Sequence, residues 1–406
     1  MTVAFVFEIF YPVVNGIVTA SHNLAQNLTA RGHRVVYIAP RWKESTITEL
    51  DGIPVYYVTS YETFIYPGMR NVFPWSTHVK KILQREEVDI VHSTGPWLLN
   101  WAALRAARKL HRGTVQTFHT MLQEPTYIRY FTRSDTVITV IQALAWRYFG
   151  FYLNRSDAVT GPSRHVTSEI ARHYPDIPLY YIPNGIDTER FAGGADYEAT
   201  RTAFPMFNRK TFIFIGRLGP EKSVDRLINA MSVAIRRDRE IRLVIIGDGP
   251  GRDAYEAQVR ELRLTDSVFF VGRISPDALR TSGLIHHARA NVTASTTESF
   301  GMTVVESMAA GTPSIVPDVP GISELTEDTG LTFPRDDIYG LAERVLMLAG
   351  DDDMRDRLSA ACTARARDFD GAAIADQFEE LYRDVLTRRA TTRQDRSDWQ
   401  QRNSTL

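Results

Sequence analysis

The chain has 406 residues, which is too long for a single hydrophobic core and predicts two or three domains. With 44% hydrophobic and 23% charged residues it has an ordinary globular composition, and its formal net charge of -1 gives no overall attraction to nucleic acid. Cys362 is the only cysteine, so an intramolecular disulfide and a cysteine-rich metal site are both excluded, which fits a reducing cytoplasm.

The first half of the chain alternates between strand-like and helix-like segments. Its opening run, "TVAFVFEIF", has no basic residue before it and is typical of a buried strand instead of a signal peptide. Strand-like runs span residues 2–10, 33–40, 53–60, 88–95, 113–120, 157–163 and 179–185. Helical patterns span residues 17–30, 76–84, 98–110, 136–153 and 164–173. This alternation predicts a parallel sheet that is covered by helices on both faces.

The second half repeats this pattern after a softer segment, residues 192–210, which is typical of a linker or loop. Strand-like runs span residues 211–217, 240–249, 267–273, 288–295, 313–319 and 330–336. Helical patterns span residues 222–236, 252–262, 276–287, 302–310, 338–348 and 372–387.

The fold class is therefore α/β, with two doubly wound, Rossmann-like domains that face each other across a cleft. We expect the first domain at residues 1–190 and the second at residues 191–370. A C-terminal helix at residues 371–388 is expected to return to the first domain. The polar, aperiodic tail at residues 389–406 is expected to be disordered.

Two cations follow the first strand of the second domain, in "IFIGRLGPEKSVDRL". Arg217 comes directly after the strand, and Lys222 stands at the predicted start of the next helix. Cations at a strand's carboxyl end and beside a helix N-terminus are suited to an anion, most often a diphosphate. The alternative is a pair of ordinary surface cations on a loop.

A second candidate site lies in "TTESFGMTVVESMAAGTPSIV". Glu298 follows a strand, Gly301 allows a ligand to come close to the backbone, and Met302 opens a helix whose first N–H groups are unsatisfied. Glu306 lies in the first two turns of that helix, where a carboxylate can accept two hydroxyls of a ribose. Glu298 can accept hydroxyls of a second sugar. The alternative is two unrelated surface glutamates.

The segment "GDGPGRDAYE" contains Asp248 in a glycine-rich turn. Its glycines resemble a dinucleotide-binding fingerprint, but Arg252 stands where the third glycine of that fingerprint belongs. We expect a tight turn near a nucleotide instead of NAD binding.

In the first domain, Asn15-Gly16 precedes the first helix in an anion-binding geometry, and His119 ends a strand. No cluster of His, Asp and Glu has ligand spacing, so no metal is predicted.

Residues 101–150 carry seven Lys and Arg and two acids, which suggests an anionic neighbour such as a membrane surface. The alternative, which is the commoner explanation of a single charge cluster, is a solvated basic helix face. The aromatic and Arg-rich stretch 127–155 is suited to a membrane interface, although a buried helix explains its rings equally well. Its apolar core, residues 137–153, is too short to span a bilayer and is interrupted by Arg147.

Taken in chain order, Asn15-Gly16, His119, "IPNGID", "GRLGPEKS", "GDGP", "FVGRI" and "ESFGMTVVESMAAGTPSIV" resemble the retaining glycosyltransferases of family four, which have the GT-B fold. The resemblance covers residues 3–386. It implies that the protein is an enzyme that needs no metal and no cofactor, because its co-substrate is a nucleotide sugar. Retention of configuration in this family is ascribed to attack on the same face, with the leaving phosphate helping to take the acceptor's proton.

The resemblance also implies residue roles. Arg217 and Lys222 would neutralise the diphosphate, Glu306 would hold the ribose, and Glu298 would hold the transferred sugar. The donor would also contact Gly16, Asp248, Arg273, Ile274, Phe300, Gly301, Met302 and Thr303, with Arg273 and Ile274 flanking the base. His119 would face the sugar at the reacting centre.

Within the family, "FEIFYPVVNGIVTASHNLA" and "FHTMLQEPTYIRYF" look most similar to members that glucosylate diacylglycerol. The expected reaction is transfer of glucose from UDP-glucose to diacylglycerol in glycolipid synthesis, by a cytoplasmic enzyme on the inner face of the membrane. The alternatives are a soluble or polysaccharide acceptor, phosphatidylinositol, a sugar-nucleotide epimerase, and a non-catalytic nucleotide binder.

Overall fold

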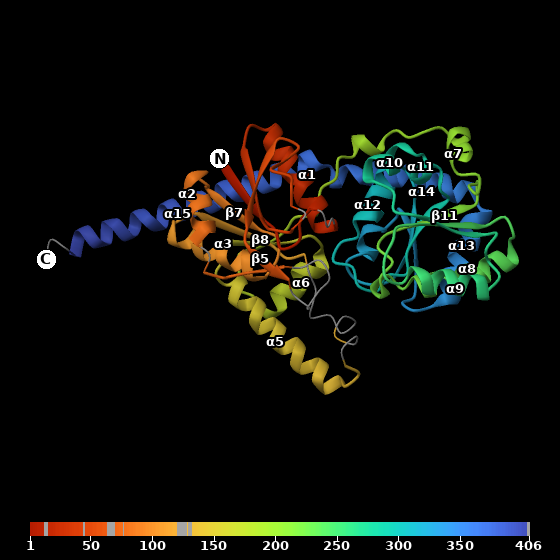
Figure 1. The fold of residues 1–406 in the computed structure, drawn as a ribbon, viewed down its shortest axis with the longest axis horizontal. Coiled ribbons are helices and arrows are strands. Elements are labelled where there is room, and N and C mark those ends of the chain that lie inside the picture. The colour runs from red at the N-terminus through yellow and green to blue at the C-terminus, as the bar shows by residue number, and fades with distance from the viewer. Residues whose placement is uncertain are drawn as a thin grey trace. The chain divides into compact units, whose positions relative to one another are not determined.

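The computed structural model describes residues 1–11, 15–43, 45–62, 70–75, 77–119, 128 and 132–403, the last twelve of these by their backbone alone. The chain divides into two compact units (Figure 1). Unit 1 comprises Met1–Gln123, Ser134–Gly185 and Gly371–Leu406, and unit 2 comprises Glu124–Arg133 and Ile186–Asp370. The chain passes from unit 1 to unit 2 after Gly185 and returns to unit 1 at Gly371.

Unit 1 contains an eight-stranded sheet in the order β10-β9-β8-β7-β1-β2-β4-β3. All neighbouring strands are parallel except β3 and β4. The strands are β1 (Thr2–Val6), β2 (Arg34–Pro40), β3 (Glu49–Leu50), β4 (Ile53–Val58), β7 (Ile90–Ser93), β8 (Gly113–Thr117), β9 (Ala158–Gly161) and β10 (Leu179–Tyr181). A separate antiparallel hairpin pairs β5 (Ser60–Glu62) with β6 (Arg70–Val72).

Helices cover both faces of this sheet, as the alternating side chains of β1 illustrate. Val3 and Phe5 pack in a core with α1 and α15, whereas Ala4 and Val6 pack with α2 and α3 on the other face. A third core joins α5 and α6. The helices are α1 (Gly16–Ala30), α2 (Thr77–Arg85), α3 (Leu98–Lys109), α5 (Asp135–Leu153), α6 (Arg164–His173) and α15 (Gly371–Asn403).

Helix α15 is longer than the sequence predicted. It packs on unit 1, where the Tyr382 hydroxyl lies 2.6 Å from His92 Nδ1 and Arg389 Nη1 donates to Asp157 Oδ1 at 2.7 Å. It then runs on to Asn403 through the segment 389–403, which was expected to be disordered. That segment has no apolar periodicity, but it also contains no Gly or Pro, so nothing in it stops a helix that is already anchored.

Unit 2 contains a six-stranded, fully parallel sheet in the order β13-β12-β11-β14-β15-β16. Its strands are β11 (Thr211–Ile215), β12 (Arg242–Ile246), β13 (Val268–Gly272), β14 (Ala290–Val292), β15 (Ser314–Pro317) and β16 (Gly330–Phe333). Its helices are α7 (Tyr197–Ala203), α8 (Val224–Arg237), α9 (Arg252–Glu261), α10 (Pro276–Thr281), α11 (Leu284–His287), α12 (Met302–Ala309), α13 (Ile338–Gly350) and α14 (Asp352–Arg365). The expected α/β fold class, with two parallel sheets, is confirmed.

Two details of unit 2 differ from the sequence prediction. The expected linker at residues 192–210 contains α7. The single helix expected at 276–287 is divided into α10 and α11 at Gly283, whose φ of 76° lies in the left-handed region. A Cβ at Gly283 would also lie 2.0 Å from Thr200 Oγ1, so this break is fixed by the packing of α7.

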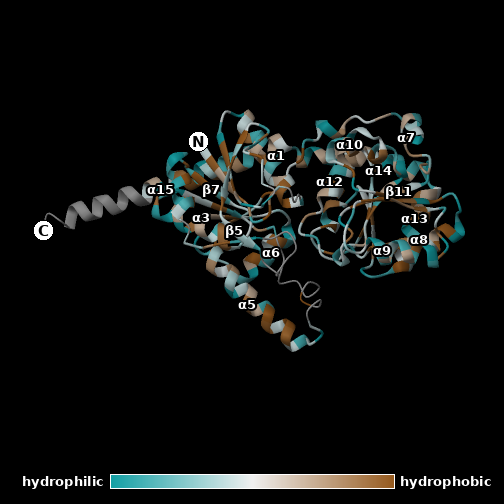
Figure 2. Ribbon diagram, in the orientation of Figure 1, coloured by the Kyte–Doolittle hydropathy of each residue, from teal (hydrophilic) through white to brown (hydrophobic). Residues whose placement is uncertain are grey.

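Figure 2 shows apolar residues gathered along the strands of both sheets and, outside them, on α5 of unit 1. Within the described part of the chain, no helix has both the length and the apolar character needed to cross a membrane.

Candidate active site

The parallel sheet of unit 2 brings most of the predicted donor-site residues to one edge. Because β13, β12, β11 and β14 are adjacent and parallel, the segments that follow them emerge side by side. Arg273 follows β13, Asp248 follows β12, Arg217 follows β11 and Glu298 follows β14. The strand order reverses between β11 and β14, which is the position where open α/β sheets bind ligands.

Two loops from this edge meet directly through charged side chains. Lys222, on the loop after β11, forms an ion pair with Glu298, on the loop after β14. Ser295 Oγ also donates to the backbone oxygen of Glu221 at 3.2 Å, which ties the same loops together. Arg217 lies beside them, with its Nη1 3.6 Å from Glu221 Oε1. Two cations and a carboxylate therefore lie together at the switch point, where Lys222 and Glu298 are half-buried and Arg217 is exposed.

Lys222 does not open the following helix as predicted. It ends a short 3-10 turn, Pro220–Lys222, and α8 begins at Val224. Ser223 between them has a φ of 49° and makes no side-chain cap for α8. The reversal at Ser223 is the physical reason for the difference, because a left-handed residue interrupts helical hydrogen bonding.

The glycines of "GDGPG" serve the packing of one loop against another. A Cβ at Gly247 would lie 1.9 Å from the carbonyl oxygen of Gly216, and one at Gly249 would lie 2.7 Å from the backbone nitrogen of Leu218. Leu218 N donates to Asp248 O at 3.0 Å across the same contact. These glycines let the loop after β12 hold the loop that carries Arg217.

Gly301 and Phe300 shape the start of α12. Gly301 is the N-cap residue with a φ of 96°, a conformation that disfavours other residues, and it supplies no capping side chain for the first N–H groups. Phe300 is buried, and its ring packs against Phe369, so its side chain belongs to the core. Met302 and Thr303 form the partly buried first turn of α12.

Gly321 is a part of this edge that sequence reasoning missed. A Cβ there would lie 2.5 Å from the backbone oxygen of Glu298, and its φ is 90°. Gly321 therefore lets the chain after β15 pack closely against the loop that carries Glu298. The signal in the sequence was "VPGIS", a Pro-Gly turn directly after a strand.

Glu306 lies on α12, and burial raises the pKa of its carboxyl group from 4.5 to about 7. The positive charge of Arg280, on α10, acts in the opposite direction and lowers this pKa. Arg280 was also missed by sequence reasoning. Its pKa is itself lowered, first by burial and then by Arg190.

The structure places the other two predicted residues, Gly16 and His119, in unit 1. Gly16 is the first residue of α1, which is capped by Asn15 through Oδ1 accepting from Val18 N at 3.0 Å. His119 follows β8 and is buried, and this burial lowers the pKa of its imidazole from 6.5 to about 4. His119 is therefore neutral at physiological pH.

Glu8 is a further buried acid at the switch point of the unit 1 sheet, where the order reverses between β1 and β7. Its Oε1 accepts from Asn100 N at 2.9 Å and from Asn100 Nδ2 at 2.8 Å. Among the described residues, neither Glu8 Oε2 nor Asn100 Oδ1 has a hydrogen-bond partner. Burial raises the pKa of Glu8 from 4.5 to about 7. The signal in the sequence was the position of Glu8 inside the buried strand-like run at residues 2–10, which sequence reasoning did not use.

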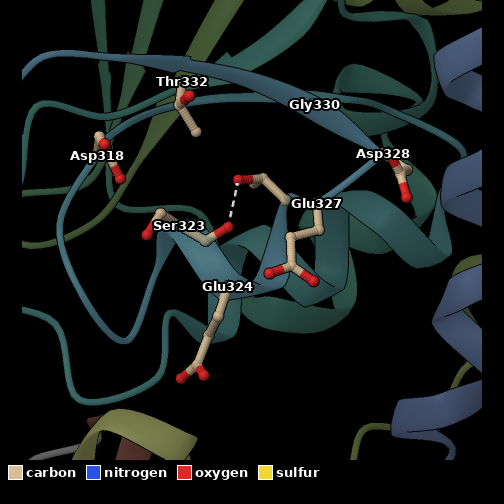
Figure 3. A pocket seen from close by; sticks show the side chains of 8 residues that line it. Asp318, Ser323, Glu324, Glu327, Asp328, Gly330 and Thr332 are labelled. Atoms are coloured by element: carbon tan, nitrogen blue, oxygen red, sulfur yellow. Dashed lines mark hydrogen bonds between the residues drawn. The ribbon is translucent and has the colours of Figure 1, made fainter.

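Figure 3 shows a hollow elsewhere in unit 2, beside β16. Its lining residues are Asp318, Ser323, Glu324, Thr326, Glu327, Asp328, Gly330 and Thr332. The lining is acidic and includes none of the predicted site residues, so it is not suited to a phosphate group. No set of three His, Cys, Asp or Glu side chains in the described ranges is arranged to hold a metal ion.

Comparisons with known proteins agree with the α/β fold described above. The family model described as Glycosyltransferase Family 4 matches residues 14–190, and that of Glycosyl transferases group 1 matches residues 200–365. The chain is 30% identical over 346 residues to a GDP-mannose-dependent alpha-mannosyltransferase of Mycolicibacterium smegmatis, covering 83% of this chain and 85% of that protein. It is 24% identical over 359 residues to an alpha-monoglucosyldiacylglycerol synthase of Streptococcus pneumoniae, covering 86% of this chain and 79% of that protein.

Among solved structures, sucrose-phosphate synthase from Thermosynechococcus elongatus has the same fold, with a TM-score of 0.77 over 95% of this chain and 99% of that one at 20% identity. Two matched family models and the parallel sheets agree with the resemblance read from the sequence motifs. The chain belongs to glycosyltransferase family 4: it is a retaining enzyme of the GT-B fold that takes its sugar from a nucleotide sugar.

Proposed function

We propose that this enzyme transfers glucose from UDP-glucose to the free hydroxyl of diacylglycerol. The observation that carries the proposal for the donor is the meeting of Lys222 with Glu298 at the switch point of unit 2, beside Arg217. Acceptor identity is supported by similarity to the glucosyldiacylglycerol synthase and by the basic, aromatic character of residues 101–155.

The donor's charged part is a diphosphate, for which Arg217 and Lys222 supply two fixed positive charges. Backbone N–H groups at the start of α12, from Gly301 to Thr303, add further donors for phosphate oxygen. Glu306 accepts two ribose hydroxyls, and Glu298 accepts hydroxyls of the transferred glucose. Residues after β12 and β13, namely Asp248, Arg273 and Ile274, lie along the same edge toward the base.

In the reaction, the bond between the sugar's anomeric carbon and the diphosphate oxygen breaks, and a bond forms from that carbon to the acceptor oxygen on the same face. The acceptor's proton passes to an oxygen of the leaving phosphate. Negative charge grows on the diphosphate as the bond breaks, so Arg217 and Lys222 stabilise the transition state more than the ground state.

His119 and Gly16 contribute from unit 1. A neutral His119 carries one N–H and one free lone pair, so it can donate to or accept from a sugar hydroxyl without adding charge. Gly16 lets a donor phosphate or the acceptor approach the N-terminus of α1 closely.

GDP-mannose is the second candidate donor. The observation that supports it is the 30% identity to the GDP-mannose-dependent mannosyltransferase. Phosphatidylinositol and soluble sugars are the alternative acceptors. A lipid acceptor also requires the enzyme to work at a membrane surface, and the excess of Lys and Arg in residues 101–150 supports binding to an anionic leaflet on the cytoplasmic side.

The test offers the purified enzyme UDP-glucose and GDP-mannose, each with diacylglycerol in detergent, phosphatidylinositol in detergent, or a panel of soluble sugars. Mass spectrometry identifies the products. We expect hexosyl-diacylglycerol from UDP-glucose. Transfer to soluble sugars alone would overturn the acceptor, and turnover with GDP-mannose alone would overturn the donor.

A further inference from the structure

Helix α5 of unit 1 exposes a long apolar face. Six large apolar side chains on it are exposed: Val137, Val140, Ile141, Leu144, Tyr148 and Phe151. They recur at spacings of three and four residues, so they form one stripe along the helix. Leu144, in the middle of the stripe, is 61% exposed. Figure 2 shows this concentration of apolar residues on α5, and Figure 1 shows the helix extending away from the sheet.

The opposite face of α5 already has its packing partners. Trp146, Phe149 and Leu153 are buried in the core that α5 shares with α6. Tyr152 is also buried, and its hydroxyl donates to Trp97 O at 3.0 Å. Val137, Val140, Ile141 and Leu144 lie outside this core, whereas the Tyr148 hydroxyl donates to Pro96 O at 2.6 Å. An exposed apolar face on a water-soluble surface marks an interaction site.

The charges around the stripe are positive. Between residues 132 and 155, Asp135 is the only acid, whereas Arg133, Arg147 and Arg155 are basic. The Arg155 guanidinium lies 3.9 Å from the ring centroid of Phe151, so cation and ring form one amphipathic unit at the end of the stripe. Arg147 is exposed, three residues after Leu144.

The surface that combines apolar rings with arginines continues from α5 onto α3. Trp101 lies 4.5 Å from Phe151 between ring centroids, and Arg105 lies 6.0 Å from the ring of Trp101. Arg105 also lies 5.9 Å from the ring of Trp75, which is 69% exposed. Tryptophan and arginine side chains are well suited to the headgroup depth of a bilayer, where one part of the side chain is apolar and another is polar.

We propose that this face of α5 is the surface that inserts into an anionic lipid leaflet and holds the enzyme at its membrane. The inference rests on the proposed lipid acceptor and identifies where the enzyme meets it. The stripe would enter the boundary between headgroups and acyl chains, while Arg133, Arg147 and Arg155 pair with lipid phosphates.

Charge decides between a membrane and a second copy of the chain. Two copies paired through this stripe would bring Arg147 and Arg155 of one copy near those of the other, with Asp135 as the only acid between residues 132 and 155 to balance them. An anionic leaflet supplies a phosphate for every arginine. The apolar stripe and its basic border therefore fit lipid better than protein of the same sequence.

The single, buried cysteine makes a direct test possible. Cys362 is 1% exposed, and burial raises the pKa of its thiol to about 12, so a new surface cysteine can be labelled selectively. We would attach an environment-sensitive fluorophore to Leu144→Cys and, as a matched control, to Tyr339→Cys, an exposed apolar position in unit 2. Each labelled protein is mixed, without donor, with phosphatidylcholine vesicles containing or lacking phosphatidylglycerol.

We expect the label at position 144 to shift to shorter wavelength with anionic vesicles and the label at position 339 to stay unchanged. In unlabelled protein, Leu144→Glu should weaken vesicle binding by about tenfold or more, and Arg147→Gln should weaken it roughly fivefold at low salt. Tyr339→Glu should leave it unchanged.

Three results would overturn the proposal. The first is no vesicle binding at low salt, and the second is vesicle binding without a change in the emission wavelength of the label at position 144. The third is a shift of that emission that depends on protein concentration in the absence of vesicles. The last would identify a second copy as the occupant. Transfer to diacylglycerol in detergent is measured separately with Leu144→Glu, where it should be unchanged. Loss of the membrane surface and loss of the lipid acceptor are thus distinguishable.

Discussion

The ammonium group of Lys222 pairs with the carboxylate of Glu298, although 76 positions separate them in the chain. Adjacent strands β11 and β14 bring them together, because each residue lies on the loop at the carboxyl end of its strand. The pair joins a cation suited to a diphosphate to a carboxylate suited to sugar hydroxyls. Both side chains are half-buried, so each keeps a surface toward solvent.

Removing either member of this pair should strongly impair transfer while leaving the fold intact. We expect Lys222→Ala and Glu298→Ala to lower kcat/KM roughly 10²–10³-fold, because a fixed charge or hydroxyl acceptor at the reacting group is lost. The free energy of unfolding should change by about 1 kcal/mol or less, as for other partly exposed ion pairs. Steady-state kinetics and urea unfolding measure the two effects.

Lys210→Ala is the matched control, since Lys210 pairs with Asp238 at 2.8 Å elsewhere in unit 2. It should leave kcat/KM unchanged. Kinetics close to wild type for both Lys222→Ala and Glu298→Ala would rule out the donor site as drawn.

Donor binding should depend on pH through Glu306. Its pKa is raised to about 7, so the ionised carboxylate that accepts ribose hydroxyls forms as pH rises through that value. KM for the donor should therefore fall between about pH 6 and pH 8, and Glu306→Gln should give a higher KM that no longer changes with pH. Arg280→Gln, which removes a charge that lowers this pKa, should move the transition to higher pH. A transition that persists in Glu306→Gln would assign it to another group.

Gly321→Ala should damage the site through the backbone. A Cβ there would lie 2.5 Å from Glu298 O at a φ of 90°, so the loop that carries Glu298 must move. We expect the free energy of unfolding to fall by about 2 kcal/mol or more, together with a lower kcat. Gly193→Ala is the control, because its Cβ would meet nothing within 4 Å and should cost less than about 0.5 kcal/mol. Equal stability of the two variants would contradict this packing argument.

The sequence predicted the order of strands and helices well, because hydrophobic alternation reports directly on burial. Arg217, Glu298 and Gly301 could be selected as candidate site residues because strand ends, a turn glycine and charges stand close together in the chain. Gly321, Arg280 and Glu8 were missed, because their importance arises from contacts with distant segments. The helical tail of α15 was missed since helix propagation beyond an anchored segment needs no apolar pattern.

Stability should also respond to Glu8. Its folded-state pKa of about 7 exceeds the ordinary 4.5, so protonation favours the folded state and this contribution is lost as pH rises through 7. Glu8→Gln cannot ionise, and its stability relative to wild type should rise by up to about 3 kcal/mol from acidic to alkaline pH. Urea unfolding of both proteins across this range measures the difference, and a constant difference would show that Glu8 ionises normally.

Transfer should not require a divalent metal. Arg217 and Lys222 already supply the positive charge that a metal would bring to the diphosphate. Activity in excess chelator should match activity in magnesium. Complete loss in chelator, with recovery on adding a divalent ion, would contradict this assignment of roles.

The central claim is tested most directly by the structure of one product. The enzyme is incubated with UDP-glucose and diacylglycerol in detergent, and the glycolipid is purified for proton NMR of its anomeric centre. Retention of the donor's configuration predicts an α-glucosyl unit on the free glycerol hydroxyl. A β-linked product, or sugar recovered only on soluble acceptors with diacylglycerol unchanged, would contradict the account.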